Sequence, residues 1–495
     1  MIETISRQEW LDRNPVLRKY IASDPIGWQT VPAFNLWPDA SEIDGITEHQ
    51  REQLSKATSG RIGILGGSPG TGKSFCVAKL IRHMLDRGLI AAQDIAVAAP
   101  TGKASVRVTE LMQSPENNIP LRAKTWHSLL GIGANSETGG WSFGHNESSP
   151  WPYRLLIGDE SSMMDLSLML AVMRARQVGC HVLFVGDVNQ LPPVGAGAPL
   201  RDMIAAGLPY GELREIKRNS GGIVEACAAI RDSLPWLDLT RADNSNLILS
   251  EINDQESKVG KIKDLLFRCE AEGLDPVWEC QVLVAVNDAS PLSRKLLNLD
   301  LQAELNPSPK MPGTIFRVGD KAVCLKNGWY RLASQVEDEE DVRRNDRDEV
   351  YVANGELAKV IAVDDRSVTF RMDSPVREVA VPMFRQPENE SADESSESKG
   401  ALANWDLGYA LSVHKSQGSE WPVAIVALDA YPGARMVCDR AWLYTAISRA
   451  KRVCHLVGPA ELAERFCKVQ KISTRKTLLK EQIQRIQFLR EVEDL

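Results

Sequence analysis

The chain has 495 residues, enough for about three domains at roughly 150 residues each. Its 43% hydrophobic and 25% charged residues are ordinary for a globular protein. It has no apolar run of ~18 residues, which argues against a membrane-spanning helix. The net charge of −8 argues against a uniformly basic nucleic-acid-binding protein, but two acidic segments, 331–350 and 386–399, contribute −4 each. The rest of the chain is neutral and can still present a local basic groove.

Two further features indicate the compartment. The first residues, MIET, lack the basic and apolar pattern of a secretion signal. The cysteines are nine in number, an odd count, and show no C-x-x-C spacing. This pattern argues against a disulfide framework or a zinc site and favours a reducing compartment. We therefore expect a soluble cytoplasmic protein with no membrane partner.

In chain order, residues 1–40 are punctuated by Trp and Pro and predict only short helices and loops. From there, apolar runs of strand length alternate with helical patterns, which indicates an α/β fold, a parallel sheet with helices on both faces. The strands expected in this part are 61–65, 94–99, 155–157 and 181–185.

A second α/β part has expected strands at 281–286 and 423–428. Between them, short alternating segments separated by turn signals predict a small antiparallel β module. The charged stretch 461–490 favours helix. The boundaries that we expect are an N-terminal region of unknown role at 1–40, a first α/β domain at 41–210, a second one at 211–313 and 401–495, and the β module at 314–400.

The segment GSPGTGKS at 67–74 matches the phosphate-binding loop G-x-x-x-x-G-K-[ST], directly after a strand and before a helix. Glycines let consecutive N–H groups curl around phosphate oxygens, and the helix N-terminus adds positive potential. Lys73 is expected to reach the β- and γ-phosphates of ATP, and the Ser74 hydroxyl to bind Mg²⁺. The alternative is a glycine-rich turn without a ligand. The predicted nucleotide-binding residues are Gly67, Pro69, Gly70, Thr71, Gly72, Lys73 and Ser74.

An acidic pair, Asp159-Glu160, follows the expected strand 155–157. The carboxyl ends of parallel strands meet at one edge of the sheet, so the pair is expected to face the phosphate loop. We expect Asp159 to hold Mg²⁺, and Glu160 to orient and deprotonate the attacking water. An Asp-Glu dipeptide alone is more typical of an exposed turn, but the loop upstream favours catalysis.

Five further segments resemble helicase motifs. They are VAAPTGKA at 97–104, KTWHSLL at 124–130, GDVNQLPPV at 186–194, SVHKSQGSEW at 412–421 and YTAISRAK at 444–451. In this order they resemble motif Ia, the T-x-H-x-L-L element, and motifs III, V and VI of superfamily-one helicases of the RecD/Dda type. The resemblance spans about 47–452. It implies two RecA-like domains that bind ATP and Mg²⁺ between them.

By this resemblance, Gln190 senses the γ-phosphate and the attacking water. Arg449 is implied to be an arginine finger of the second domain, which stabilises charge on the γ-phosphate when the cleft closes. Arg218 resembles the second arginine, from motif IV, although Asn219 stands where the family usually has Gln. The alternative for Arg218 is a surface arginine.

Gln50 occupies the position of the family's adenine-reading glutamine. The pattern T-x-x-Q before an apolar run, here Thr47 to Gln50, also predicts a helix capping box, and both interpretations stay open. Gly418 and Glu420 match motif V positions that the resemblance places near the nucleotide and the domain interface.

Translocation requires contacts to the sugar–phosphate backbone that do not read sequence. The resemblance places six residues of the motif loops along the DNA strand: Thr101, Lys103, Thr125, His127, His414 and Lys415. The alternative for both histidines is an ordinary packed or capping role. A preference for DNA over RNA is implied by the family alone.

Residues 131–153 contain Gly139-Gly140 followed by Trp141 and Phe143 in alternation, which predicts a short hairpin with an aromatic face. In the family, an insertion here carries the pin that splits the duplex. A stacked aromatic contributes about 1–3 kcal/mol per base. The alternative is a surface loop whose Trp141 packs on its own domain.

The β module at 314–400 resembles the family's SH3-like insertion, which braces the pin and encloses the strand. Its acidic segments 331–350 and 386–399 would repel DNA, so we expect them on its outer face. Deletion of 386–399 is therefore expected to leave DNA binding intact.

Together these features imply an ATP-dependent DNA helicase that moves 5′→3′ on single-stranded DNA and acts on duplex junctions, as a monomer, in replication, repair or recombination. One alternative is a single-strand translocase or remodeller that unwinds little duplex. Another is an ATPase subunit of a larger repair, recombination or defence complex. A small-molecule P-loop kinase accounts for Lys73 but not for the motifs at 412–421 and 444–451.

Overall fold

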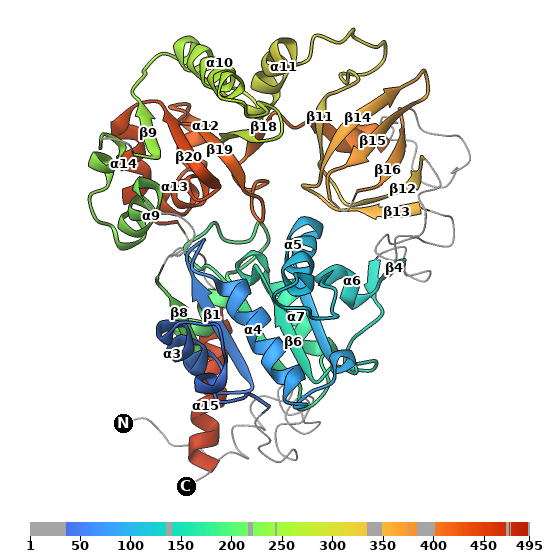
Figure 1. The fold of residues 1–495 in the computed structure, drawn as a ribbon, viewed down its shortest axis with the longest axis vertical. Coiled ribbons are helices and arrows are strands. Elements are labelled where there is room, and N and C mark those ends of the chain that lie inside the picture. The colour runs from blue at the N-terminus through green and yellow to red at the C-terminus, as the bar shows by residue number, and fades with distance from the viewer. Residues whose placement is uncertain are drawn as a thin grey trace, which may run out of the picture.

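The computed structural model describes residues 36–134, 141–215, 221–242, 245–333, 349–374, 376–383, 401–471, 475 and 477–493. Three large sheets make up its architecture, two of them parallel and one antiparallel (Figure 1). Most of the N-terminal region and of both acidic segments lies outside the described residues. The outer placement of the acidic loops therefore stays a prediction.

The first lobe is built on a six-stranded parallel sheet. Its strand order is β3 (Lys124–Thr125), β2 (Ile95–Ala99), β6 (Leu155–Gly158), β7 (His181–Gly186), β1 (Ile62–Gly67) and β8 (Tyr210–Leu213). One face packs on α3 (Glu48–Ala57), α4 (Lys73–Asp86) and α5 (Gly102–Gln113). The other face packs on α6 (Trp126–Leu130), α7 (Leu166–Ala175) and α8 (Pro199–Ala205).

Two separate cores form because successive strand residues point to opposite faces. Along β1, Leu65 enters the core under α4, while its neighbour Ile64 enters the core on the other face. The predicted parallel sheet with helices on both faces is confirmed, and the four predicted strands end within two residues of the observed ones.

The second lobe contains a five-stranded parallel sheet. Its order is β18 (Ala410–Ser412), β10 (Cys280–Val284), β19 (Trp421–Ala427), β20 (Ala450–Val457) and β9 (Leu247–Ser250). One core includes α9 (Gly222–Asp232), α12 (Pro432–Val437), α13 (Arg440–Ile447) and α14 (Ala460–Lys468). The opposite core includes α10 (Gln255–Ala271) and α11 (Arg294–Leu305).

The β module is a seven-stranded antiparallel sheet that the chain forms between α11 and β18. Its order is β13 (Glu349–Val352), β12 (Gly328–Leu332), β16 (Glu378–Pro382), β15 (Ser367–Met372), β14 (Leu357–Val363), β11 (Lys321–Cys324) and β17 (Trp405–Leu407). It shares a core with α10 and α11, and inside it Phe370 stacks on Trp405 with ring centroids 4.1 Å apart. The predicted antiparallel module is confirmed. In Figure 1 it lies beside the second lobe and above the end of the first that carries α5 and α6.

A short hairpin, β4 (Ile132–Ala134) and β5 (Trp141–Phe143), follows α6. The two strands pair antiparallel with Ile132 opposite Phe143, which agrees with the predicted hairpin. Its turn, 135–140, lies outside the described residues, as does the Trp141 side chain. The predicted wedge contact through Trp141 therefore stays a prediction.

The C-terminal segment returns from the second lobe to the first. Leu479 and Ile483 of α15 (Leu479–Glu493) pack against the core formed by α7 and α8. Ahead of this helix, Arg475 donates hydrogen bonds of 2.7 and 2.9 Å to the carbonyls of Pro193 and Gly195. Among the described residues, no helix is long and apolar enough to cross a membrane.

Candidate functional site

The phosphate loop begins where β1 ends and stops where α4 begins. Gly67, Gly70 and Gly72 have φ angles of 155°, 83° and 86°, which a residue with a side chain rarely adopts. A Cβ on Gly67 would lie 2.7 Å from the Leu213 carbonyl oxygen. The loop therefore needs glycine for its backbone curl and for its close approach to β8.

Lys73 folds back over this loop. Its Nζ donates to the carbonyl oxygens of Gly67 at 2.6 Å and Ser68 at 3.1 Å. The Thr71 hydroxyl closes the loop with a 2.8 Å bond to the same Ser68 carbonyl. The ammonium is thus held at the mouth of the loop, where a phosphate would offer it a stronger, charged acceptor.

Two side-chain oxygen groups that are able to bind a metal ion lie close together beside the phosphate loop. The Ser74 hydroxyl, in the first turn of α4, donates a 2.9 Å hydrogen bond to Oδ2 of Asp159, at the end of β6. Asp159 is buried, with 8% of its surface exposed. A hydroxyl and a carboxylate at this distance are the hard oxygen ligands that Mg²⁺ prefers, so the residues fit the predicted metal.

Glu160 sits next to this pair in a left-handed backbone conformation, with φ of 48°. Its Oε2 atom is buried and has no hydrogen-bond partner among the described residues. Burial, and then the charge of Asp159, raise the pKa of the Glu160 carboxyl, while Lys73, Arg449 and Arg107 oppose the rise. A carboxylate oxygen without a partner among the described residues is suited to accept a proton from water.

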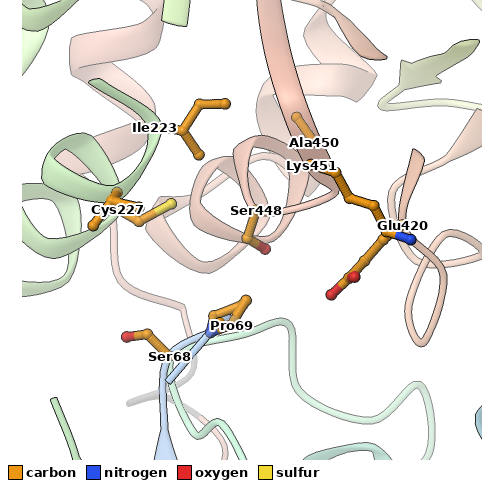
Figure 2. Close-up of a pocket in the computed structure, with 10 residues that line it drawn as sticks. Ser68, Pro69, Ile223, Cys227, Glu420, Ser448, Ala450 and Lys451 are labelled. Carbon is orange, nitrogen blue, oxygen red and sulfur yellow. The ribbon is translucent and has the colours of Figure 1, made fainter. Parts of the chain in front are cut away.

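The second lobe covers the phosphate loop and leaves a pocket of about 430 Å³, including its open mouth. Figure 2 shows Ser68 and Pro69 on one side and, on the other, residues of α9, of the start of β20 and of the loops before β19 and β20. The lining residues are Ser68, Pro69, Gly70, Ile223, Val224, Cys227, Glu420, Ser448, Ala450 and Lys451.

Arg449 stands in the chain between the lining residues Ser448 and Ala450 and is buried, 2% exposed. Its guanidinium donates to the carbonyls of Thr445 at 3.0 Å and Ser419 at 3.1 Å, and to the Ser448 hydroxyl at 3.0 Å. These bonds hold it within its own lobe. Its charge nevertheless acts on Glu160 across the cleft.

The loop after β7 joins the two lobes. The Tyr444 hydroxyl donates to Asp187 at 2.7 Å, and the Leu191 N–H donates to the Thr445 hydroxyl at 2.8 Å. Gln190 lies within this loop, 3% exposed, and its Oε1 has no partner among the described residues. The structure thus places Gln190 at the lobe interface with a free acceptor atom.

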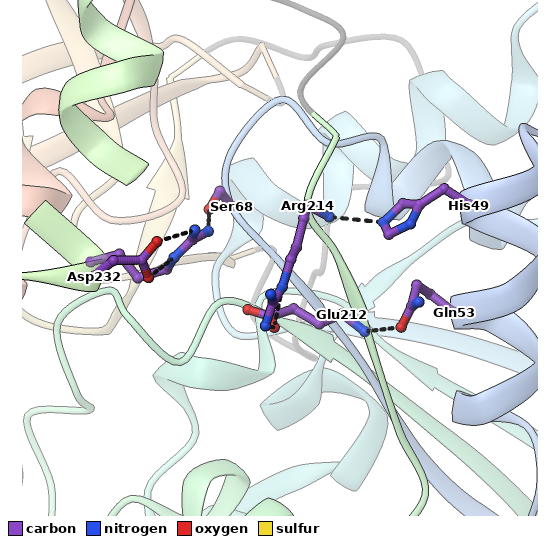
Figure 3. Close-up of polar contacts among 7 residues, drawn as sticks. His49, Gln53, Ser68, Glu212, Arg214 and Asp232 are labelled. Carbon is purple, nitrogen blue, oxygen red and sulfur yellow. Dashed lines mark hydrogen bonds and ion pairs between the residues drawn. The ribbon is translucent and has the colours of Figure 1, made fainter. Parts of the chain in front are cut away.

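The predicted second arginine, Arg218, lies outside the described residues. A different arginine of the second lobe reaches the loop: Arg231 of α9 donates to the Ser68 hydroxyl at 3.4 Å. Its guanidinium also forms two 2.8 Å bonds with Asp232. Figure 3 labels both partners, Ser68 and Asp232. Sequence reasoning missed Arg231 because an Arg-Asp pair at a helix end is typical of ordinary surface.

Gln50 takes part in the capping box, as one of its two interpretations predicted. Its Oε1 accepts from the Thr47 N–H at 3.0 Å, and its own N–H donates to the Thr47 hydroxyl at 3.3 Å. Its Nε2 donates to the Thr71 carbonyl of the phosphate loop at 3.2 Å. The cap is confirmed, while adenine recognition stays a prediction.

A second unpredicted residue is Arg107, on α5. Its Nη2 lies 3.2 Å from Oε2 of Glu420 in the second lobe. Partial burial works to lower the pKa of Arg107, but Glu420, Glu160 and Asp159 outweigh it and raise that pKa. Nearby, Gly418 has a φ of 75° and lies close to the Thr101 hydroxyl. No pattern in the sequence singles out Arg107, since only the closed lobes bring it to Glu420.

Two family models match the chain: an AAA domain over residues 50–196 and a UvrD-like helicase C-terminal domain over 407–457. Over 444 residues the chain is 31% identical to the ATP-dependent RecD2 DNA helicase of Deinococcus radiodurans, covering 89% of this chain and 52% of that protein. It is 26% identical over 504 residues to the RecBCD enzyme subunit RecD of Mycolicibacterium smegmatis, covering 96% and 82%.

Over most of its length the chain is thus similar to these RecD-type proteins. It spans about half the length of the Deinococcus relative. Among solved structures, a Pif1 helicase from Bacteroides with ADP-AlF3 and ssDNA aligns with 91% of this chain and 98% of that chain, at 18% identity and a TM-score of 0.47.

In this RecD-like chain, two of the residues predicted to contact DNA, Thr101 and Thr125, cap helices. The Thr101 hydroxyl accepts from the Ala104 N–H at 3.3 Å and caps α5, and the Thr125 hydroxyl accepts from the Ser128 N–H at 3.2 Å and caps α6. Both residues stand where the chain enters a helix, so nearby N–H groups face outward from the same turns. Their role on DNA stays a prediction.

The two lysines predicted to bind DNA, Lys103 and Lys415, both contact residues of the β module. Lys103 Nζ lies 3.5 Å from the Asp373 carboxylate and 5.4 Å from the Trp421 ring centre. Lys415 Nζ donates a 2.6 Å bond to Asn354 Oδ1. The lysines come from different lobes, so the module contacts both sides of the predicted strand path.

The two predicted histidines lie in different surroundings. His127 is half-buried, and its ring lies 6.3 Å from that of Phe143 on the hairpin, which is 36% exposed. Burial lowers the pKa of His414, an effect that Asp439 opposes and Arg475 reinforces. A neutral imidazole can donate one hydrogen bond and accept another but contributes no charge to a phosphate contact.

Proposed function

We propose that this chain is an ATP-dependent DNA helicase that translocates 5′→3′ along single-stranded DNA and unwinds duplex, with two RecA-like lobes. The observation that carries the proposal is the cleft itself. A phosphate loop with its Ser74–Asp159 pair faces a second lobe that brings Glu420 to the pocket and the charge of Arg449 within reach of Glu160. Hydrolysis of ATP in such a cleft would change the contacts of both lobes, because a phosphate bound there would contact both.

The side chains present fit ATP and Mg²⁺. Ser74 and Asp159 would hold the Mg²⁺, which neutralises phosphate charge when bound. Lys73 would exchange its two backbone carbonyls for the β- and γ-phosphates. Oε2 of Glu160 and Oε1 of Gln190, which have no partner in the described part of the chain, would orient the attacking water, and Glu160 would take its proton.

The second lobe would supply the remaining groups. Arg449 already acts on Glu160 electrostatically and would stabilise charge on the γ-phosphate as the lobes close. Arg218 would act with it as the family's second arginine. Gln50 would read the adenine, and Gly418 and Glu420 would lie beside the nucleotide.

Movement along DNA would use contacts in both lobes. Thr101, Lys103, Thr125 and His127 belong to the first lobe, and His414 and Lys415 to the second. Alternate opening and closing would carry the strand past the two sets of contacts. The Deinococcus relative, a DNA helicase by name, supports DNA as the substrate.

Strand separation would occur at the hairpin β4–β5, which we propose to be the pin, with Trp141 and Phe143 as its aromatic contacts. The β module would be the SH3-like insertion that braces it. The partly exposed Phe143 and its contact with His127 support this placement, because they join the hairpin to the predicted strand path.

The proposal is tested with two otherwise identical duplexes, one with a 5′ and one with a 3′ single-stranded tail. We expect ATP-driven separation from the 5′ tail only, abolished in Lys73→Ala. Separation from the 3′ tail alone would contradict the proposed polarity.

A second candidate is an ATPase subunit of a larger DNA-processing complex. The mycobacterial relative, of which this chain covers 82%, is by name a subunit of the RecBCD enzyme, and this favours the candidate. ATP hydrolysis stimulated by single strands without strand separation by the isolated chain would support this alternative, or a translocase that unwinds little duplex.

A further inference from the structure

Helix α5 extends between the two sites of the proposed mechanism, the predicted DNA path and the ATP cleft. The loop before it and its first turn carry Thr101 and Lys103, which the proposed function places on the DNA strand. Arg107 follows Lys103 by four residues and therefore lies on the same side of the helix, about 6 Å further along its axis. The first turns of α5 thus extend from the predicted strand path to the ATP cleft.

Arg107 contacts the opposite lobe at this cleft. Its Nη2 lies 3.2 Å from Glu420 Oε2, and Glu420 lines the pocket above the phosphate loop (Figure 2). The Glu420 side chain is only 11% exposed, so its charge depends on nearby cations. Because the two residues belong to different lobes, this contact requires the lobes to be closed.

The Arg107 charge also acts on the catalytic carboxylates predicted in the first lobe, Asp159 and Glu160. The guanidinium therefore lies among acidic groups of both lobes. Its neighbour along the helix, Lys103, has alternative partners in Asp373 and Trp421. A phosphate that displaced those partners would shift the start of α5, and a helix transmits such a shift over one turn.

We propose that Arg107 is a positioning residue that couples strand binding to ATP hydrolysis, by fixing Glu420 of the second lobe against the ATP cleft when single-stranded DNA engages the start of α5. The inference rests on the proposed function and deepens it. In this inference Arg107 acts mainly through its contact with Glu420, and its charge beside Asp159 and Glu160 adds to the effect. The planar guanidinium of Arg107 forms hydrogen bonds in fixed directions. A small shift of α5 can therefore form or break its contact with Glu420.

The test is steady-state ATP hydrolysis with and without a thymidine oligonucleotide, together with oligonucleotide binding. In Arg107→Gln, the stimulation of kcat by DNA is expected to fall about threefold to tenfold, while KM for ATP and Kd for the oligonucleotide stay within about twofold. Arg107→Lys, which keeps the charge, is expected to retain part of the stimulation. The double variant with Glu420→Gln is expected to lose no more stimulation than the worse single variant.

Arg82→Gln is the matched control. Arg82 forms a 2.7 Å ion pair with Asp86 within α4, and its side chain is 38% exposed, against 42% for Arg107. The control should keep full stimulation. Equal stimulation in Arg107→Gln and wild type would overturn the inference, as would a rise in KM for ATP that accounts for the whole loss. If DNA does not stimulate the wild-type enzyme, the proposed function itself fails, and the inference with it.

Discussion

At the residue scale, the side chains around the phosphate loop have hydrogen-bond partners within the protein. Lys73 donates hydrogen bonds to two backbone carbonyls. The Gln50 side-chain amide accepts a hydrogen bond from the Thr47 N–H and donates one to the Thr71 carbonyl. ATP must compete for these groups. Glu160 Oε2 and Gln190 Oε1 have no hydrogen-bond partner among the described residues, and these are the atoms proposed to orient water.

Gln50 offers a test that separates its two interpretations. Gln50→Ala is expected to lower the preference for ATP over GTP, measured as the ratio of kcat/KM values, by about tenfold, because one adenine hydrogen bond is lost. Thr47→Ala is the control, since it removes the cap and leaves the Gln50 amide in place. Both variants should lose about 1 kcal/mol of stability. An unchanged nucleotide preference in Gln50→Ala would leave Gln50 as a cap alone.

At the element scale, α3 is pressed directly onto the sheet. A Cβ on Gly63 of β1 would lie 1.7 Å from the Ala57 carbonyl oxygen, and one on Gly211 of β8 would lie 1.8 Å from the Gln53 carbonyl oxygen. The Gln53 side chain also accepts from the Glu212 N–H at 3.0 Å (Figure 3). This close packing fixes the distance between α3 and the sheet, and therefore the position of Gln50 beside the phosphate loop.

Gly63→Ala is therefore expected to lower the free energy of unfolding by about 1–3 kcal/mol or more, because α3 must move off the sheet. Thermal unfolding followed by circular dichroism measures the effect. Gly260→Ala, inside α10, has open space around the added Cβ and is expected to raise stability by about 0.5–1 kcal/mol. Similar changes in the two variants would contradict the close packing of α3.

The elements that could be predicted are those with a strong local pattern. Strands β1, β2, β6 and β7 are apolar on both faces, and α4 follows a loop motif. Strands β8, β9 and β18 were not predicted. They are only three or four residues long, and their strand conformation comes from hydrogen bonds to a neighbour far away in the chain.

At the scale of the whole molecule, the β module contacts both lobes through the lysines predicted to bind DNA. Asp373 faces Lys103, and Asn354 faces Lys415. A carboxylate at a lysine occupies the position that a phosphate would need. DNA bound at these lysines, as predicted, would therefore displace contacts of the module.

Asp373→Asn is expected to tighten binding of a single-stranded oligonucleotide by about twofold to fivefold, the range of an exposed ion pair. Fluorescence anisotropy at fixed salt measures this, since phosphate contacts depend on ionic strength. Asp365→Asn, in the turn between β14 and β15, makes the same change of charge elsewhere on the module. Equal tightening in both variants would show an effect of net charge and contradict direct competition for Lys103.

The sequence by itself determined the phosphate loop, the acidic pair after β6, the order of the helicase motifs and the presence of an antiparallel module. Each of these is a local pattern whose physical cause lies within a few residues: glycine for a curled backbone, apolar runs for buried strands, turn residues between alternating segments. For the same reason the capping box at Thr47 and Gln50 was visible before the fold was known.

Only the tertiary structure decided which groups meet across the cleft. Ser68 and Arg231 are 163 residues apart, and Arg107 and Glu420 belong to different lobes. Arginines and glutamates on helix surfaces look alike in a sequence, because their side chains are long and their partners are chosen by packing. The lobes, the β module and the returning C-terminal segment fix those partners, through contacts that no local pattern encodes.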